Sequence, residues 1–492
     1  MKGRSMILHQ DDHWLAVDLP IGMAAQSRRA GELGAIEWLE LYHGWKTRVV
    51  AAPAAGVSGV LLLGLGEQDF SADDAVVVHE FMTSATPPSD HWEQNGANFT
   101  VIDHSEHSFR IKVQTSGLSV DVCRLAAQSG TPILGDKDNG GNPWPRLALH
   151  VSQLQFPGIE QPIHAPSPPS FTTPGSYAHC RDLRGLWLPS ITNTFRAIHR
   201  DEIPGLPAAV DVYADWFDAV WFDEEADQAT IHSALDPILE DIRTAHGCLG
   251  GTLRIHRRNP HQRSLVIETE IVGDTPPARF TVEEHGLKYE ISLTETQHTG
   301  LFLDQRDTRR RLALIAKGRR LANLFAYTCS FSVAAAAAGV EVAFSVDLAR
   351  ACLETGKTNF ALNNLAETQR GKFVKDDVRK WLARQQRRRN DKPNEYRDLN
   401  LVVCDPPVFA SSKEGGRFSV EKEWEGLARV AAELMGKHGL AVFANNHRGG
   451  DHRRYLETLT SAFSKVTELA PPLDFPRLPG EPPHVRTFWC ES

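Results

Sequence analysis

The chain has 492 residues, too many for a single hydrophobic core, so we expect two to four domains. Its apolar share of 41% and charged share of 23% are those of a soluble globular protein, and no apolar run is long enough to span a membrane. The net charge of −9 argues against a protein that coats nucleic acid with its whole surface, but leaves room for a local basic face.

The seven cysteines are dispersed, and none belongs to a Cys-x-x-Cys pair. An odd number without that spacing indicates neither a disulfide framework nor a zinc site, so we expect no bound metal and a cytoplasmic setting. Residues 1–12 lack the apolar core of a secretory signal, and we expect none.

Strands and turns dominate the first predicted domain, residues 1–160, with strands expected at 57–63, 99–101 and 109–113. A proline-rich stretch follows, and because it opposes helix and sheet we place a linker at 161–176. A small central α/β domain is predicted at 177–275, with a helix at 231–246 and a strand at 265–272.

Strands and helices alternate in the last predicted domain, residues 276–492, as in a mainly parallel, doubly wound sheet. Such a sheet binds ligands at the carboxyl ends of its strands. The strands are expected at 320–324, 341–346, 372–374, 399–403 and 440–444, and the helices from 332 and at 349–364, 378–389 and 421–437.

Polar residues follow four successive strands of this domain. The loop 323–330 comes after the first strand, and Asp347 and Asp377 come after the second and third. A carboxylate at the second strand end can accept both ribose hydroxyls of a nucleoside, and one at the third can accept the adenine amino group. Either aspartate alone is more simply a helix cap, but four ordered positions together predict a nucleoside site.

The fourth position is the motif Asp405-Pro406-Pro407-Val408-Phe409. Two prolines stiffen the loop, which can present its carboxylate, its carbonyl groups and an aromatic ring to a planar base. The alternative is a proline-rich turn that caps a helix.

Residues 286–490 resemble the guanine-N7 methyltransferase half of the bifunctional bacterial 23S rRNA methyltransferases and, more broadly, the related rRNA cytosine-C5 methyltransferases. The resemblance is carried by the motifs at 286–290, 299–306, 323–330, 346–347, 359–365, 405–413, 445–449 and 474–475, with His484. It implies a Rossmann-like class I methyltransferase fold, S-adenosyl-L-methionine as cofactor, and an RNA substrate, either 23S rRNA or a ribosomal assembly intermediate. Residues 199–211 resemble the small domain that precedes the catalytic domain in this superfamily.

The same resemblance implies roles for individual residues. The cofactor would be bound by Asp304, Gln305, Arg306, Asn323, Phe325, Tyr327, Thr328, Asp347 and Asp377. The base would be positioned by Asp405, Pro406, Pro407, Phe409 and Asn445. One departure is Cys329, which stands where relatives have a glycine that lets the backbone approach the cofactor.

The two related subfamilies differ in chemistry. Methylation at C5 of cytosine needs a thiolate to attack C6, and the relatives that do this carry Cys-Ser after the late strand. This chain has Asn445-Asn446-His447 there, while period-2 alternation places Cys404 in the core. Guanine N7 already has an in-plane lone pair, so we favour N7 methylation by direct in-line transfer. The alternatives are C5 methylation and a non-catalytic RNA-binding or ribosome-assembly factor.

Residues 7–157 resemble the α+β fold of the RluA-type pseudouridine synthases, in the motifs at 7–12, 17–22, 58–63, 132–136, 149–150 and 154–157. The catalytic aspartate of that family falls on Ala54, which can neither attack a sugar nor accept a proton. We therefore expect a degenerate domain without synthase activity, which either docks RNA or serves as a scaffold. Basic clusters at 306–320 and 384–389 could likewise contact RNA or form solvated helix faces.

Overall fold

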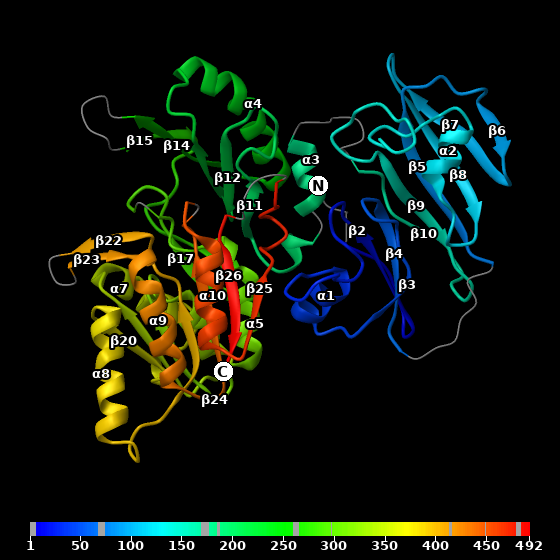
Figure 1. Cartoon of the computed structure of the whole chain (residues 1–492). Helices are drawn as coiled ribbons and strands as arrows, with labels where there is room; N and C mark the ends of the chain where they lie inside the picture. Colours follow the sequence, from blue (N-terminus) through cyan, green and yellow to red (C-terminus); the bar gives the residue numbers. More distant parts are fainter. Residues whose placement is uncertain are drawn as a thin grey trace.

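The computed structural model describes residues 6–66, 74–168, 177–184, 187–258, 265–296, 298–412, 416–447, 449–478 and 484–492. Three large sheets follow one another along the chain, and we call the parts built on them the first, second and third units. In Figure 1 the first unit is blue to cyan, the second lies at the top, and the third runs from green to red below it. None of the described helices is long and apolar enough to cross a membrane.

In its described residues, the first unit is a ten-stranded sheet with two helices. Its main strand order is β1-β2-β4-β9-β5-β8-β7-β6, with β3 paired to β4 and β10 to β9. The strands are β1 (Ile7–Gln10), β2 (Trp14–Leu19), β3 (Arg48–Ala51), β4 (Ser58–Gly64), β5 (Val76–Thr83), β6 (His91–Gln94), β7 (Ala97–His104), β8 (Phe109–Ser116), β9 (Leu149–Gln155) and β10 (Ile163–His164), and the helices are α1 (Ala35–His43) and α2 (Val122–Gln128).

The proline-rich stretch differs from the linker expected at 161–176. Ile163 and His164 pair with Leu154 and Gln153 of β9, so the chain remains part of the first sheet beyond residue 160. Residues 169–176, the rest of that expected linker, lie outside the described residues.

The second unit is a five-stranded sheet in the order β11-β12-β13-β14-β15. Its elements are α3 (Tyr177–Arg184), a 3-10 turn (Leu188–Ser190), β11 (Thr194–Ile198), β12 (Ala208–Tyr213), β13 (Trp216–Trp221), α4 (Gln228–His246), β14 (Gly250–Arg258) and β15 (Leu265–Gly273). Its core is continuous with part of the first unit, since Trp187 packs edge-on against Trp38 of α1, with ring centroids 4.9 Å apart.

The third unit contains a seven-stranded sheet in the order β20-β19-β18-β21-β24-β26-β25. The first five strands are parallel, and β26 joins antiparallel, which confirms the expected mainly parallel sheet. The strands of that sheet are β18 (Arg320–Leu324), β19 (Val342–Asp347), β20 (Gly371–Lys375), β21 (Leu399–Cys404), β24 (Met435–Asn445), β25 (Lys465–Leu469) and β26 (Arg486–Glu491). Two separate hairpins of the unit are formed by β16 (Phe280–Glu284) with β17 (Leu287–Ile291), and by β22 (Phe409–Ser412) with β23 (Gly416–Ser419). Its helices are α5 (Arg306–Ile315), α6 (Ser330–Ala337), α7 (Arg350–Leu362), α8 (Val378–Asp391), α9 (Val420–Leu434) and α10 (His452–Ala462), with 3-10 turns at Leu303–Gln305 and Ala366–Thr368.

Buried ion pairs fix α5 against its surroundings. The Arg306 guanidinium donates to both oxygens of Asp474, at 2.7 and 3.0 Å, and both side chains are fully buried. The second Asp474 oxygen also accepts the backbone N–H of Arg196 in β11 at 2.9 Å. Arg309 forms a second bidentate pair with Glu284 of β16, at 2.8 and 2.7 Å. These contacts join α5 to the second unit, the β16–β17 hairpin and the segment before β26.

Candidate active site

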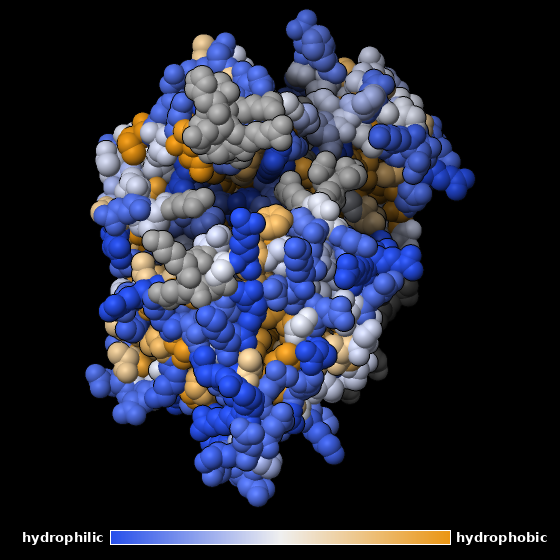
Figure 2. Space-filling model, turned by 60° about the vertical axis from the view of Figure 1, so that its left-hand side comes forward, coloured by the Kyte–Doolittle hydropathy of each residue, from blue (hydrophilic) through white to orange (hydrophobic). Residues whose placement is uncertain are grey.

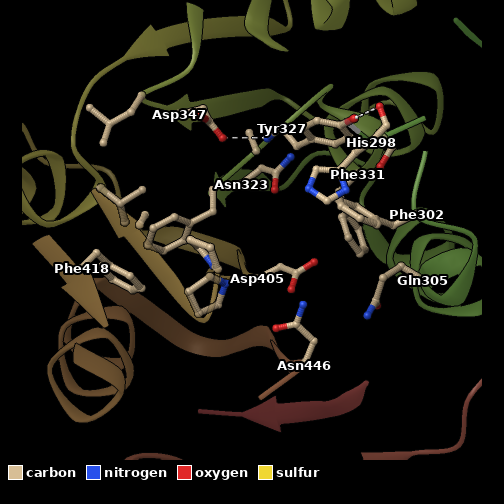
Figure 3. A pocket seen from close by; sticks show the side chains of 18 of the residues that line it. His298, Phe302, Gln305, Asn323, Tyr327, Phe331, Asp347, Asp405, Phe418 and Asn446 are labelled. Carbon is tan, nitrogen blue, oxygen red and sulfur yellow. Dashed lines mark hydrogen bonds between the residues drawn. The ribbon is translucent and has the colours of Figure 1, made fainter. Parts of the chain in front are cut away.

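A cavity of about 360 Å³ opens at the carboxyl ends of β18, β19, β20 and β21 (Figure 3). It is the place where a doubly wound sheet offers loops from several strands to one ligand. The residues that line it are His298, Phe302, Asp304, Gln305, Arg309, Asn323, Phe325, Ala326, Tyr327, Ser330, Phe331, Asp347, Leu348, Asp376, Asp377, Val378, Arg379, Asp405, Pro406, Pro407, Ala410, Gly416, Phe418, Asn446, His484 and Val485.

The loop after β18 has an unusual backbone. Phe325, Tyr327 and Cys329 have positive φ angles of 57°, 48° and 65°. Such angles cost a non-glycine residue roughly 1 kcal/mol or more each, so the surroundings must hold the loop in place. Asp347 accepts the Tyr327 N–H at 2.9 Å, and the Thr328 hydroxyl donates to the Gly300 carbonyl at 2.6 Å. The result is a rigid loop that carries Phe325 and Tyr327 to the cavity wall.

Cys329 points away from the cavity, into the contact between this loop and α7. Its side chain is fully buried beside Gly356, where an added Cβ would overlap the Cys329 sulfur. Burial raises the pKa of the Cys329 thiol to about 12, so it stays protonated. The cysteine that replaces the expected glycine is therefore accommodated by a glycine on the facing helix.

We expect Gly356→Ala to lower the free energy of unfolding by about 1–3 kcal/mol, because the new methyl group overlaps the Cys329 sulfur. The double variant Cys329→Gly/Gly356→Ala should regain at least half of that loss in urea denaturation. The matched control is Gly426→Ala on α9, where an added Cβ meets nothing within 4 Å and should stabilise by about 0.5–1 kcal/mol. Equal losses from Gly356→Ala with and without Cys329 would contradict the packing argument.

Asp347 is the last residue of β19, and Asp377 directly precedes α8. The two Asp347 oxygens accept N–H groups of Tyr327 and Ala349 at 2.9 and 2.8 Å, which orients the carboxylate and leaves lone pairs for ligand hydroxyls. Asp377 lines the cavity but also caps α8 by accepting the Arg379 N–H at 2.8 Å. Burial acts to raise the pKa of Asp377, yet its hydrogen bonds with Arg379 outweigh burial and lower the pKa.

Two further carboxyl groups, Asp405 and Asp304, face the cavity from opposite elements. Burial and the neighbouring Asp304 raise the pKa of Asp405 to about 7, although Arg309 acts in the other direction. Burial likewise raises the pKa of Asp304 to about 6, and Arg196 and Arg309 oppose that rise. In Figure 3 the side chains of Asp405 and Asn446 point toward one another across the cavity floor. This end of the cavity therefore offers a carboxyl group that titrates near neutral pH.

Four residues expected in the site do not line the cavity. Arg306 is held by Asp474, and the Thr328 hydroxyl by Gly300, so their side chains serve the scaffold rather than a ligand. Phe409 is 68% exposed and packs edge-on against His447, outside the cavity wall. Asn445 is buried, and its side-chain oxygen accepts the His447 N–H at 2.8 Å. The neighbouring Asn446 lines the cavity in its place.

Sequence reasoning missed several cavity residues, among them His298, Arg309, Phe331, Phe418 and Asn446. Alternation along a strand could have predicted Asn446, because successive side chains point to opposite faces. If Asn445, the last residue of the strand, faces the core, the side chain of Asn446 points away from it. Phe418 lies on β23 of the β22–β23 hairpin and lines the cavity, for which the sequence carries no local signal.

No cysteine occurs among the described residues that line the cavity. Cys404 is fully buried in β21, and burial raises the pKa of its thiol far above the ordinary value. It belongs to the core, as alternation along the strand predicted. The cavity walls therefore offer carboxyl, amide and aromatic groups but no thiolate.

The two basic clusters have different environments. In the first, Arg306 and Arg309 are buried in ion pairs and are not available to RNA. In the second, Arg384 pairs with Asp376, while Arg387 and Arg388 are exposed on α8. Arg388 lies ten residues into α8, on the order of 15 Å from its start beside the cavity. Figure 2 shows one face of the molecule, and mostly hydrophilic side chains cover its lower half, at the height of the third unit.

Comparison with known proteins completes the description of the site. A family model described as S-adenosylmethionine-dependent methyltransferase matches residues 203–480. Ribosomal RNA large subunit methyltransferase K of Neisseria meningitidis serogroup B is 33% identical over 258 residues, which cover 51% of this chain and 69% of that protein. Ribosomal RNA large subunit methyltransferase K/L of Shewanella oneidensis is 37% identical over 300 residues, which cover 58% of this chain but only 38% of that protein.

Solved structures show the same fold. A putative methyltransferase complexed with SAH aligns with a TM-score of 0.52 at 23% identity, over 75% of this chain and 98% of its own. A putative SAM-dependent methyltransferase from Streptococcus mutans aligns with a TM-score of 0.51 at 21% identity, over 76% of this chain and 98% of its own.

Proposed function

Because this chain belongs to the family of S-adenosylmethionine-dependent methyltransferases, we propose that it methylates RNA of the large ribosomal subunit at N7 of a guanine. The RNA class is suggested by the relatives, whose names specify ribosomal RNA of the large subunit. The position on the base is suggested by the chemistry of the cavity.

S-adenosylmethionine is the cofactor, and the described residues fit its nucleoside part. Asp347 is oriented by two backbone N–H groups and retains lone pairs for ribose hydroxyls. Phe325 and Val378 supply apolar wall to a planar base, and Asp377 lies at the same end. When bound, the cofactor supplies an electrophilic methyl group on a cationic sulfur.

The observation that carries the choice of N7 is that Asp405 and Asn446 face one another in a cavity whose described walls carry no thiol. Guanine presents N–H donors at N1 and N2, which an ionised Asp405 can accept, while its N7 lone pair remains free for an in-line attack. Methylation at N7 leaves a positive charge on the purine, and Asp405 with Asp304 would stabilise that charge. A route through C5 of cytosine would need a thiolate, which these walls do not offer.

For the rest of the chain we propose the domains 1–160, 177–275 and 276–492, with β10 (Ile163–His164) as an extension of the first. We propose that the first is a degenerate pseudouridine synthase-like domain that helps to dock RNA. Ala54, at the position of that family's catalytic aspartate, lines a second cavity of about 360 Å³ in the first unit. His150 does not offer a replacement base there, because it is buried and its ring nitrogens bond to Ser58 and the Ala165 carbonyl at 2.9 and 3.2 Å.

Asp347→Ala should weaken S-adenosylmethionine binding at least tenfold in isothermal titration, because the ribose loses its acceptor and the loop loses the Tyr327 N–H contact. Asp391→Ala, an exposed change at the far end of α8, serves as the control and should bind normally. Unchanged affinity in Asp347→Ala would refute the assigned cofactor orientation.

The substrate is tested by mass-spectrometric mapping of nucleosides in 23S rRNA from cells with and without the gene. We expect one N7-methylguanosine to be missing without the gene and to return when purified protein is added. Loss of a 5-methylcytosine instead would overturn the N7 assignment. No change in any RNA would favour the non-catalytic alternative.

A further inference from the structure

A polar cleft of about 540 Å³ lies where the three units meet, away from the methyl-transfer cavity. Its walls come from the end of α1, the segment before β11, the β16–β17 turn and the middle of α5. The lining residues are Tyr42, His43, Pro189, Ser190, Ile191, Thr192, Asn193, Glu283, His285, Gly286 and Arg310. None of these residues lines the methyl-transfer cavity.

Two histidines of this cleft have buried ring nitrogens that lack a partner. Nε2 of His43 and Nε2 of His285 have no hydrogen-bond partner among the described residues. Stacking fixes both rings, since His285 lies 4.5 Å from the Tyr42 ring at an interplanar angle of 11°, and His43 lies 4.7 Å from Trp45 at 20°. A buried polar atom without a partner is uncommon and costly, so each nitrogen has hydrogen-bonding capacity that the described residues leave unused.

The charge around the histidines sets their state. Burial is the main cause that lowers the pKa of His285 to about 4, and Arg310 contributes although Glu284 opposes it. Burial and Arg310 also lower the pKa of His43. Both rings are therefore neutral at physiological pH, and each can offer one N–H as a donor.

Arg310 supplies positive charge to the same cleft. Its Nε donates to the Leu41 carbonyl at 3.0 Å, but no ion pair joins it to a carboxylate in the described part of the chain. Its neighbours on α5 differ, because Arg306 and Arg309 are neutralised by Asp474 and Glu284. Glu283 also lines the cleft, but it is exposed and makes no ion pair with Arg310 within the described residues.

Apart from the exposed carboxylate of Glu283, the side chains of this cleft offer more donors than acceptors. The guanidinium of Arg310, the two imidazole N–H groups and the side-chain amide of Asn193 can all donate, whereas the Asn193 oxygen already accepts the Glu283 N–H at 2.7 Å. An oxyanion with several acceptor oxygens satisfies such a set, whereas the uncompensated arginine disfavours a metal cation. We propose that the cleft binds a phosphoryl group, presented by a nucleotide or by the backbone of an RNA.

This site would have a direct structural effect. Arg309 lines the methyl-transfer cavity and the next residue, Arg310, lines the cleft, so α5 separates the two sites. A phosphoryl group held by His43, His285 and Arg310 would contact the first and third units at once. The bound phosphoryl group would therefore stabilise the contact between the first unit and the third unit.

The experiment is titration calorimetry on the full chain, with S-adenosylhomocysteine present so that a nucleotide cannot occupy the first cavity. The probes are inorganic phosphate, adenosine 5′-monophosphate and a six-nucleotide oligoribonucleotide, each compared with chloride at equal ionic strength. We expect saturable binding of at least one probe, weakened at least tenfold by Arg310→Gln. Binding of phosphate and mononucleotide indicates a small-molecule ligand, and binding of the oligonucleotide alone indicates an RNA backbone.

The matched control is Arg311→Gln, which removes the same charge from the next residue of α5, outside the cleft, and should leave affinity unchanged. His285→Phe keeps the stacking on Tyr42 but removes the ring nitrogens, and it should also weaken binding; its thermal unfolding would show whether the fold is retained. The proposal is overturned if no probe binds beyond the chloride control, or if Arg310→Gln and Arg311→Gln weaken binding equally. Neither result depends on whether RNA is methylated.

Discussion

Asp405→Asn lowers the turnover number for methyl transfer to RNA at least a hundredfold while leaving S-adenosylmethionine affinity within about threefold of the wild type. Asparagine keeps the shape of the side chain, so the Pro406-Pro407 loop should persist. It cannot provide the negative charge that accepts two guanine N–H groups and stabilises the cationic product. Loss of one such electrostatic group costs roughly 10²–10³ in rate. Single-turnover transfer from labelled cofactor measures the effect.

The pH dependence separates a role for the charge from a role for the shape. Because the pKa of Asp405 is raised to about 7, the group is mostly protonated at pH 6 and mostly ionised at pH 8. If the carboxylate is the active form, the wild-type rate rises through pH 7 and levels off above it, whereas the rate of Asp405→Asn stays flat. A wild-type rate that falls over the same interval would mean that the protonated acid is required, and the proposed contact with guanine would be wrong.

The second large effect is on stability, and it concerns Asp474. Asp474→Ala should reduce the free energy of unfolding by about 3–5 kcal/mol, because it leaves the fully buried Arg306 guanidinium without its partner. It also removes the acceptor for the Arg196 N–H in β11. Urea denaturation followed by tryptophan fluorescence measures the loss.

Two further variants test that explanation. Replacing both partners, Arg306→Met with Asp474→Leu, should recover much of the stability, since no buried charge then remains unpaired. The control is Asp398→Ala, whose carboxylate is 43% exposed and lies 3.6 Å from Arg389. An exposed pair contributes about 1 kcal/mol or less, so a comparable loss from Asp398→Ala would contradict the importance of burial.

The sheet of the third unit could be predicted because its signals are local. Buried residues mark β18 and β21, and an acidic residue stands at the end of two strands: Asp347 is the last residue of β19, and Asp405 directly follows β21. Parallel strands then bring their carboxyl ends together whatever the details of the loops. The cavity therefore appeared where the order of strands and acidic residues placed it.

The rest depended on tertiary contacts that no local pattern contains. Arg306 follows two cavity residues in the sequence, yet the helix turn directs it to Asp474, 168 residues away. A difference of one residue at the end of β24 exchanges Asn445 for Asn446 in the cavity wall. The core that Trp187 shares with Trp38 links two units whose sequences show no sign of each other.

The contact between Cys329 and Gly356 shows that a requirement for smallness can belong to a pair of positions. Where the backbone loop and α7 approach closely, there is room for one side chain and not for two. A glycine-based search pattern for the cofactor loop would reject this chain at residue 329. The space that the Cys329 side chain needs is nevertheless provided by Gly356, 27 residues later. A graft of this loop onto a helix that carries a side chain at the position of Gly356 would fail for the same reason.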